Sequence, residues 1–360
     1  MGNTDNYDTF LRLLNYSDNS SDPSYTVSEF VQFCPKADVN QFGAKFMPLF
    51  YYINFVLSYL GNGLILVIIY KFEKLSTVTN IFLLNLVMSN ILFASSLPFW
   101  AMYYSSEWIF GTVMCKMVSS AYFVGFYSSI LFLILMTFDR YLAVVHAVTA
   151  ARERKKAYAI GASGAVWCIS VVASMTELVL QNVWEHPIYG LMCEETGFSI
   201  STMNRWHLVS YYQQFLLFFL LPLFVVMYCY ISITIRIMST QMKEKCRAIK
   251  LIFIIIITFF ICWTPFNVVI LLRAIRISAG NENRCAEMQA LDFALYVTQN
   301  IAYLYCCISP VFYTFVGKKF QSHFRRLLVK KIPCLKRQIS LNSQSSRTTS
   351  VRTPHKVHEY

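Results

Sequence analysis

Seven long apolar blocks dominate the sequence and fix what it can fold into. They cover residues 46–70, 78–104, 112–145, 156–180, 208–238, 247–275 and 287–316, and polar or charged residues flank each block. A helix of about 20 residues crosses the roughly 30 Å hydrocarbon core of a bilayer. One such block could be a buried helix of a soluble protein, but seven in succession with short connectors cannot. The pattern therefore predicts an all-α membrane protein, a seven-transmembrane helix bundle.

Composition agrees with this fold and argues against other classes. Of the 360 residues, 56% are hydrophobic and 14% are charged, which is too little charge for the surface of a soluble protein. A closed barrel would need strands of alternating hydrophobicity. A transporter or channel would need mid-span charges or paired repeats, and an enzyme a nucleophile–base or metal-ligand pattern. The sequence has none of these, so we predict no catalytic residue, no metal site and no cofactor.

Lysine and arginine predict the orientation in the membrane. They concentrate in the connectors after the first, third and fifth blocks and in the tail after the seventh. Basic connectors stay in the cytoplasm. We therefore expect a multi-pass plasma-membrane protein with an extracellular N-terminus and a cytoplasmic C-terminus. The net charge of +12 then mostly faces anionic membrane lipids, and nucleic acid is not an expected partner.

The chain divides into four predicted parts. Residues 1–45 form an acidic extracellular arm, 46–316 the bundle, 317–334 a short amphipathic eighth helix on the membrane surface, and 335–360 a cytoplasmic tail rich in Ser and Thr. The arm either attracts a basic protein ligand or merely keeps the chain soluble. Phosphorylation of the tail would create charge clusters that cytosolic proteins read. Candidate modifications are glycosylation at Asn15 and Asn19, sulfation at Tyr7, Tyr16 and Tyr25, and palmitoylation at Cys334.

Four cysteines fall on the predicted outer side, and an even number in an oxidising compartment indicates two disulfides. They allow three pairings, of which we favour Cys115–Cys193 and Cys34–Cys285. The first pair would pin the long connector 181–206 over the bundle. The second would tie the N-terminal arm to the last outer loop.

Polar residues inside apolar spans are costly and usually face the interior of the bundle. Asn62, Asn90, Ser129 and Ser309 could form one hydrogen-bonded layer. Each could equally be a separate interhelical contact worth about 1 kcal/mol. Position in the sequence does not separate these two interpretations.

Two segments have the composition of a conformational switch. Trp263 stands two residues before Pro265, and a proline kink beside a bulky ring makes a pivot for the sixth span. At the inner end of the third span, Asp139 precedes Arg140 and Tyr141. A guanidinium beside a carboxylate can be held in a local ion pair and then released to another partner.

These residues resemble a known family. Gly61-Asn62, the stretch 108–111 (WIFG), Cys115, Asp139-Arg140-Tyr141, Trp167, Pro222, Tyr230 and Trp263-Thr264-Pro265 look like the signatures of rhodopsin-like G-protein-coupled receptors. Narrower motifs are similar to those of chemokine receptors of the CC or XC branch. These are residues 96–100 (SLPFW), 139–147 (DRYLAVVHA), 247–253 (RAIKLIF) and 291–317.

The resemblance implies a receptor that binds an extracellular chemokine in two stages, with the ligand body on the acidic arm and its N-terminus in the bundle. It also implies an inhibitory-class G protein on the inner side, with arrestin and receptor kinases acting on the tail. The residues that match the family's pocket are Tyr51, Trp100, Tyr122, Phe266 and Gln299. Those that match its activation switch are Asp139, Arg140, Tyr141, Tyr230, Trp263, Pro265, Ser309 and Tyr313.

Three positions depart from the family pattern. Asn90 stands where the family usually has Asp, Ser309 where it usually has Asn, and Gln299 where an acidic residue is common. The first removes the charge that a sodium site needs. The departures leave an alternative open, an atypical receptor that scavenges chemokine without G-protein output. The intact Asp139-Arg140-Tyr141 favours signalling.

Overall fold

The structure is a computed structural model that describes residues 37–72, 77–148, 156–186, 190–197, 199–240, 246–279, 285–316 and 322–324. The helices are α2 (Ala37–Phe72), α3 (Val78–Ser105), α4 (Gly111–Val145), α6 (Lys156–Ala173), α7 (Met175–Leu180), α8 (Ile200–Phe215), α9 (Leu221–Thr240), α10 (Cys246–Ser278) and α11 (Cys285–Val316). A π-helical segment, η2 (Leu216–Leu220), joins α8 to α9. The strands are β1 (Gln181–His186) and β2 (Gly190–Glu195).

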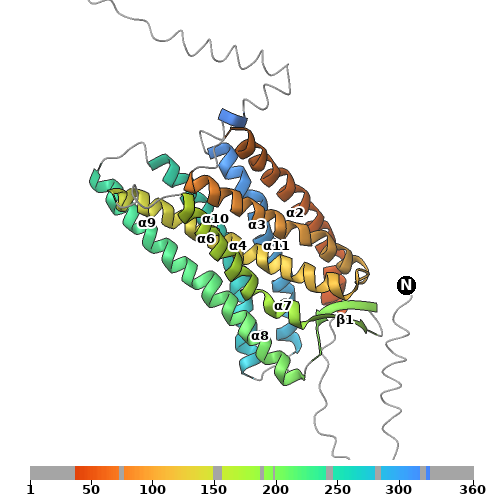
Figure 1. The fold of residues 1–360 in the computed structure, drawn as a ribbon. Coiled ribbons are helices and arrows are strands. Elements are labelled where there is room, and N and C mark those ends of the chain that lie inside the picture. Colours follow the sequence, from red (N-terminus) through yellow and green to blue (C-terminus); the bar gives the residue numbers. More distant parts are fainter. Residues whose placement is uncertain are drawn as a thin grey trace, which may run out of the picture. The chain divides into compact units, whose positions relative to one another are not determined.

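The predicted seven-helix bundle is confirmed. Among the described residues, six helical segments are long and apolar enough to cross a membrane: Asn40–Phe72, Val78–Ser105, Gly111–Val145, Lys156–Leu180, Ser201–Ser239 and Ile256–Ser278. Helix α11 is the seventh, with 32 residues. In Figure 1 the helices lie side by side, and the β1–β2 hairpin lies at the end where α7 stops. We call this the hairpin end, and the opposite end the Arg140 end.

The distribution of side chains suits a lipid solvent. Leu60, Phe224 and Ile261 are 67%, 63% and 66% exposed, whereas Asn62 and Asn90 are 0% and 1% exposed. An aqueous surface with so much apolar area would aggregate, and a bilayer core instead favours apolar side chains outside. The polar residues of the spans therefore lie between helices, where other protein groups can satisfy them.

Helix α4 is the central helix of the bundle. It packs against α3, α6 and α9 and also contacts α10, while α11 packs between α10 and α2. Gly125 permits the close approach of α4 to α3, because a Cβ at this position would lie 2.6 Å from the backbone nitrogen of Phe93. Backbone cannot yield as a flexible side chain can, so the α3–α4 contact requires glycine there.

The hairpin closes one end of the bundle. The predicted disulfide Cys115–Cys193 is confirmed, with the two Cα atoms 5.7 Å apart, and it fastens β2 to α4 near the start of that helix. Trp108 is fully buried beside this bridge. Its backbone N–H donates to Leu191 O at 2.8 Å, and Glu107 Oε2 accepts from Leu191 N at 2.9 Å. These contacts fix the connector between α7 and α8 across the end of the bundle.

Several boundaries differ from those predicted. Helix α2 begins at Ala37 rather than at residue 46, and the fifth span begins at Ile200 rather than at 208. Hydrophobicity locates only the segment inside the hydrocarbon, and a helix can continue past it into polar surroundings. The fourth span is interrupted at Ser174 between α6 and α7.

Candidate functional site

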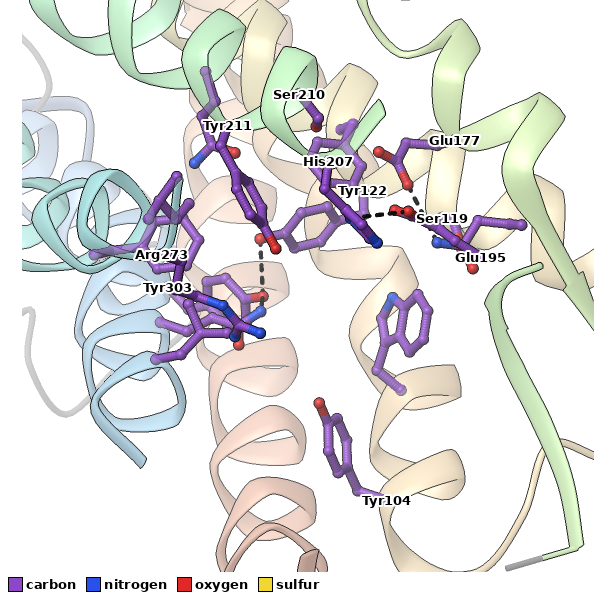
Figure 2. A pocket seen from close by; sticks show the side chains of 18 of the residues that line it. Tyr104, Ser119, Tyr122, Glu177, Glu195, His207, Ser210, Tyr211, Arg273 and Tyr303 are labelled. Atoms are coloured by element: carbon purple, nitrogen blue, oxygen red, sulfur yellow. Dashed lines mark hydrogen bonds and ion pairs between the residues drawn. The ribbon is translucent and has the colours of Figure 1, made fainter. Parts of the chain in front are cut away.

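A cavity of about 270 Å³ opens among the helices at the hairpin end. Helices α2, α3, α4, α7, α8, α10 and α11 and both strands contribute to its wall. Figure 2 shows side chains from these elements pointing into a common space. All the predicted pocket residues line this one cavity: Tyr51, Trp100, Tyr122, Phe266 and Gln299. Residues far apart in the sequence are thus brought together, as a pocket for one ligand requires.

Tyrosines linked by hydrogen bonds form one wall of the cavity. The Gln299 amide donates to the hydroxyl of Tyr303. This hydroxyl donates to Tyr122 at 2.9 Å (Figure 2). The Tyr51 ring packs against Tyr303 and Tyr104, with centroids 5.6 and 5.8 Å apart. Helices α2, α3, α4 and α11 are joined through this wall, so a ligand that displaces one ring acts on all four.

The charged groups of the cavity come from α7, β2, α8 and α10. Arg273 Nη1 lies 2.8 Å from Asp292 Oδ1, and His207 Nδ1 lies 3.1 Å from Glu195 Oε2. Glu177 is 4% exposed and accepts a hydrogen bond from Gln181 at 3.3 Å. Figure 2 shows Glu177, Glu195 and His207 together on one side, with Arg273 apart from them. The cavity is therefore polarised, with its carboxylates gathered on one side.

Burial raises the pKa of Glu195 from its ordinary value of 4.5 to about 7. Loss of hydration disfavours the charged carboxylate. The charge of Glu195 therefore changes near neutral pH, and this side of the cavity becomes more negative as the pH rises.

The base of the cavity contacts the predicted pivot. Phe266 lines the cavity and packs edge-on against Trp263, with ring centroids 5.8 Å apart. Trp263 in turn stacks on Phe126 of α4 at 4.3 Å. Helix α10 continues through Pro265 next to this contact. A ligand that moves Phe266 therefore pushes on the contact between α10 and the central helix.

A polar layer lies deeper in the bundle. Asn90 Nδ2 donates to Asn62 Oδ1 at 3.2 Å, and Asn62 Nδ2 donates to Cys306 O of α11 at 3.1 Å. Two of the four residues predicted for one layer thus meet and join α2, α3 and α11. The hydroxyl of Ser129 donates to Phe126 O on its own helix at 2.9 Å. The side chain of Ser309 lies outside the described part of the chain.

At the Arg140 end, a threonine lies between the charged residues. Thr79 Oγ1 donates to Asp139 Oδ2 at 3.1 Å and accepts from Arg140 Nη2 at 3.0 Å. The hydroxyl of Tyr141 lies 3.1 Å from His146 Nε2. Asp139 is 1% exposed, so its carboxylate is enclosed by the bundle. Tyr230 is also buried at this end, where its ring packs against Phe253 with centroids 5.0 Å apart.

Comparison with known proteins identifies the family. The family described as 7 transmembrane receptor (rhodopsin family) matches residues 61–313. C-C chemokine receptor type 3 of Cavia porcellus is 37% identical over 305 residues, which are 84% of this chain and 84% of the relative. C-C chemokine receptor type 1 of Homo sapiens is 36% identical over 83% of this chain and 84% of its own. C-C chemokine receptor type 4 of Homo sapiens is 34% identical, with 91% and 92% covered.

The chain belongs to the chemokine receptor family of rhodopsin-like G-protein-coupled receptors. The receptor is accordingly a multi-pass protein of the plasma membrane. The cavity, the Phe266–Trp263 contact and the Thr79 network described above are parts of a seven-helix receptor.

Other predicted residues lie outside the described part of the receptor. They are Asn15, Asn19, Tyr7, Tyr16, Tyr25, Cys34 and Cys334, together with the tail 335–360. Cys285 and Tyr313 lie on α11, but their side chains are not among those described. Of the predicted eighth helix, residues 322–324 are described and are helical. His323 stacks on Phe72 with ring centroids 4.8 Å apart, and Phe324 packs against the core.

Several residues of the cavity were not predicted from the sequence. Glu177, Glu195, His207, Gln214 and Arg273 all line it. The one available signal for Glu177 was a carboxylate near the end of an apolar block, which marks a functional position by default. Within the described part of the chain, no three His, Cys, Asp or Glu side chains gather in a way that could hold a metal ion.

Proposed function

We propose that the receptor binds an extracellular chemokine at the hairpin end and activates an inhibitory-class heterotrimeric G protein at the Arg140 end. The observation that carries the proposal is the contact from the cavity through Phe266 to Trp263 and on to Phe126. The names of its relatives, which are C-C chemokine receptors, favour a chemokine as the ligand. Ligand binding selects one of two packings of α10 against α4, and the G protein selects the same one.

The proposed orientation places the hairpin end outside the cell. The Cys115–Cys193 disulfide supports this, because such bonds persist in oxidising compartments. The basic residues of the connectors and of the sequence after α11 support it from the other side. The acidic arm would then meet the ligand first and raise the rate of encounter with a basic protein.

The proposal extends to the two ends of the chain. The arm, residues 1–45, would hold the chemokine body, with glycans at Asn15 and Asn19 and sulfate on its tyrosines. Residues 317–334 would lie on the inner membrane surface, anchored by a lipid on Cys334. The contact of His323 with Phe72 supports a return of the chain toward the bundle at this point. Arrestin and receptor kinases would act on the phosphorylated tail 335–360.

A scavenging receptor is the second candidate. The observation that favours it is the hydrogen bond between Asn90 and Asn62. Both groups are neutral, whereas the resemblance leads us to expect a charged aspartate at position 90. Such a receptor would internalise chemokine without nucleotide exchange on the G protein. The Arg140–Thr79 network favours the signalling receptor, since it supplies the releasable arginine.

The test is a panel of purified chemokines applied to cells that display the full-length receptor. We expect one or more chemokines to bind, to raise calcium and to suppress cAMP. Arg140→Ala should abolish both responses but keep binding, and Arg205→Ala, an exposed arginine on α8, should behave as wild type. If the wild-type receptor and its variants bind and internalise chemokine without any calcium or cAMP response, the scavenger is favoured. An unchanged calcium and cAMP response in Arg140→Ala would refute the proposed switch.

A further inference from the structure

Two carboxylates from different elements share one side of the cavity. Glu177 comes from α7, Glu195 comes from β2, and both line the space shown in Figure 2. The strand register pairs Gln181 with Glu195, and the same Gln181 donates a hydrogen bond to Glu177. The hairpin therefore sets the position of both acids at once. They are close enough for the charge of Glu195 to act on Glu177.

The cations of the cavity do not balance both acids when both are ionised. Arg273 is held by Asp292 at 2.8 Å, so its charge is balanced apart from the acids. His207 faces Glu195 at 3.1 Å and can balance at most one carboxylate. Among the described residues, the partner that hydrogen-bonds Glu177 is the neutral amide of Gln181. A cationic ligand group would complete the balance.

A buried amide supplies an independent sign of a ligand. Gln214 of α8 lines the cavity and is 4% exposed. Among the described residues, its Nε2 has no hydrogen-bond partner. Leaving a buried donor without an acceptor is unfavourable, so such a group is normally satisfied by something that enters the site. An amide N–H donor matches a carbonyl oxygen.

We infer that Glu177 and Glu195 bind a primary ammonium, the N-terminal α-ammonium of a peptide ligand, while Gln214 donates to the first carbonyl oxygen of that ligand. The inference deepens the proposed function and rests on it where the ligand is a chemokine. It places the anchoring charge at α7 and β2, away from α11, where the neutral Gln299 is engaged with Tyr303. The aromatic wall, including Tyr122, packs against the rest of the ligand's first residues.

The first experiment compares two forms of each active chemokine from the panel, with a free and with an acetylated N-terminus. Acetylation removes the charge and leaves the rest of the protein unchanged. We expect Glu177→Gln and Glu195→Gln to lose about tenfold or more in potency toward the free form, as for a lost charge-assisted hydrogen bond. The acetylated form should act equally on wild type and on both variants. Glu185→Gln, an exposed glutamate on β1, is the matched control and should lose nothing.

Equal losses for the free and acetylated forms would show that the variants disturb the structure and would overturn the inference. So would full potency of an acetylated chemokine on the wild type. The wild-type comparison stands even if Glu177→Gln fails to reach the cell surface. Chemokine binding without any of these effects would leave the proposed function intact and refute the ammonium site.

The second experiment does not need a chemokine. Phenethylammonium is a small aromatic cation, and its N-acetyl derivative is neutral with the same ring. We expect millimolar phenethylammonium to raise the unfolding temperature of the purified receptor in detergent, and the N-acetyl derivative to have no effect. Glu195→Gln should lose this response and Glu185→Gln should keep it. The same response to both compounds, or none in the wild type, would overturn the site, whereas a selective response with no active chemokine would refute the proposed function alone.

Discussion

Asn90 donates a hydrogen bond to Asn62 over 3.2 Å in the interior of the receptor. The two amides lie on adjacent helices and are almost completely buried, at 1% and 0% exposure. A hydrogen bond between two buried amides joins their helices without introducing a net charge. Neutral hydrogen bonds therefore join α2, α3 and α11 in this layer.

Asn90→Asp should convert this layer into a sodium site. The new carboxylate would be buried beside Asn62, and a buried charge requires a partner. We expect sodium to stabilise the variant by about 1 kcal/mol at a concentration some five times its dissociation constant. Thermal unfolding of the purified receptor in sodium chloride and in choline chloride checks this. The wild type should respond alike to both salts, and an equal response in the variant would contradict the prediction.

The raised pKa of Glu195 predicts a pH-dependent stability. Because the folded state holds this proton more tightly than the unfolded state, stability is highest at low pH and is lost as the pH rises from about 4.5 to about 7. The loss assigned to Glu195 is at most about 3 kcal/mol. Glu177, His207 and the Arg273–Asp292 pair also lie around this cavity and titrate or carry charge, so the wild type must be compared with a variant.

Glu195→Gln supplies that comparison, since it keeps the shape and removes the titration. The difference in unfolding temperature between wild type and variant should favour the variant increasingly as the pH rises toward 7. Measurements between pH 5 and pH 8 in one detergent check this window, and the exposed Glu185→Gln serves as the control. A difference that stays constant with pH would show that burial does not hold the proton.

Lys116 of α4 fastens the short helix that carries Glu177. Its ammonium donates to Leu178 O at 3.0 Å and to Val179 O at 3.1 Å, at the carbonyl end of α7. Lys116→Met keeps most of the side-chain volume and removes both donors, so we expect a loss of about 1 kcal/mol in unfolding free energy. Potency at the cavity should fall as well, because Glu177 is no longer held in place. Lys156→Met, at the exposed start of α6, is the matched control for thermal unfolding.

A comparison of two glycines, one at a close helix contact and one in open space, tests the packing of the bundle. A Cβ on Gly125 would lie 2.6 Å from the backbone of Phe93, whereas one on Gly164 of α6 meets nothing within 4 Å. Gly125→Ala should lower the stability by about 2 kcal/mol or more. Gly164→Ala should be neutral or raise it by a few tenths of a kcal/mol, since alanine favours the helix. Surface expression and thermal unfolding of both variants decide the question, and equal effects would refute the close contact.

The helices could be predicted from the sequence because hydrocarbon imposes long apolar blocks, and the structure has a helix at each one. The ends of the helices could not be predicted, because helices such as α2 extend into polar surroundings where hydropathy gives no signal. The hairpin of β1 and β2 was missed because its strands are short, with six residues each. Their side chains do not alternate clearly between buried and exposed, so the sequence carries no regular apolar–polar alternation. The number and side of the cysteines left three pairings open, and Cys115–Cys193 was the one preferred because it would pin the connector over the bundle. The meeting of Glu177 with Glu195 could not be predicted, because it depends on how the hairpin folds back.

At the Arg140 end, too, a decisive contact could not be predicted from the sequence. Nothing in the sequence singles out Thr79, yet its hydroxyl donates to Asp139 and accepts from Arg140. Because one hydroxyl holds both members of the switch, its loss should favour the state in which Arg140 is released. Thr79→Val keeps the shape and removes the hydroxyl, so it should raise G-protein nucleotide exchange without ligand several-fold, as expected for a lost hydrogen bond of about 1 kcal/mol. Thr79→Ser keeps the hydroxyl and should stay near the wild type. If both variants exchange nucleotide at the wild-type rate while reaching the surface equally, Thr79 does not restrain Arg140.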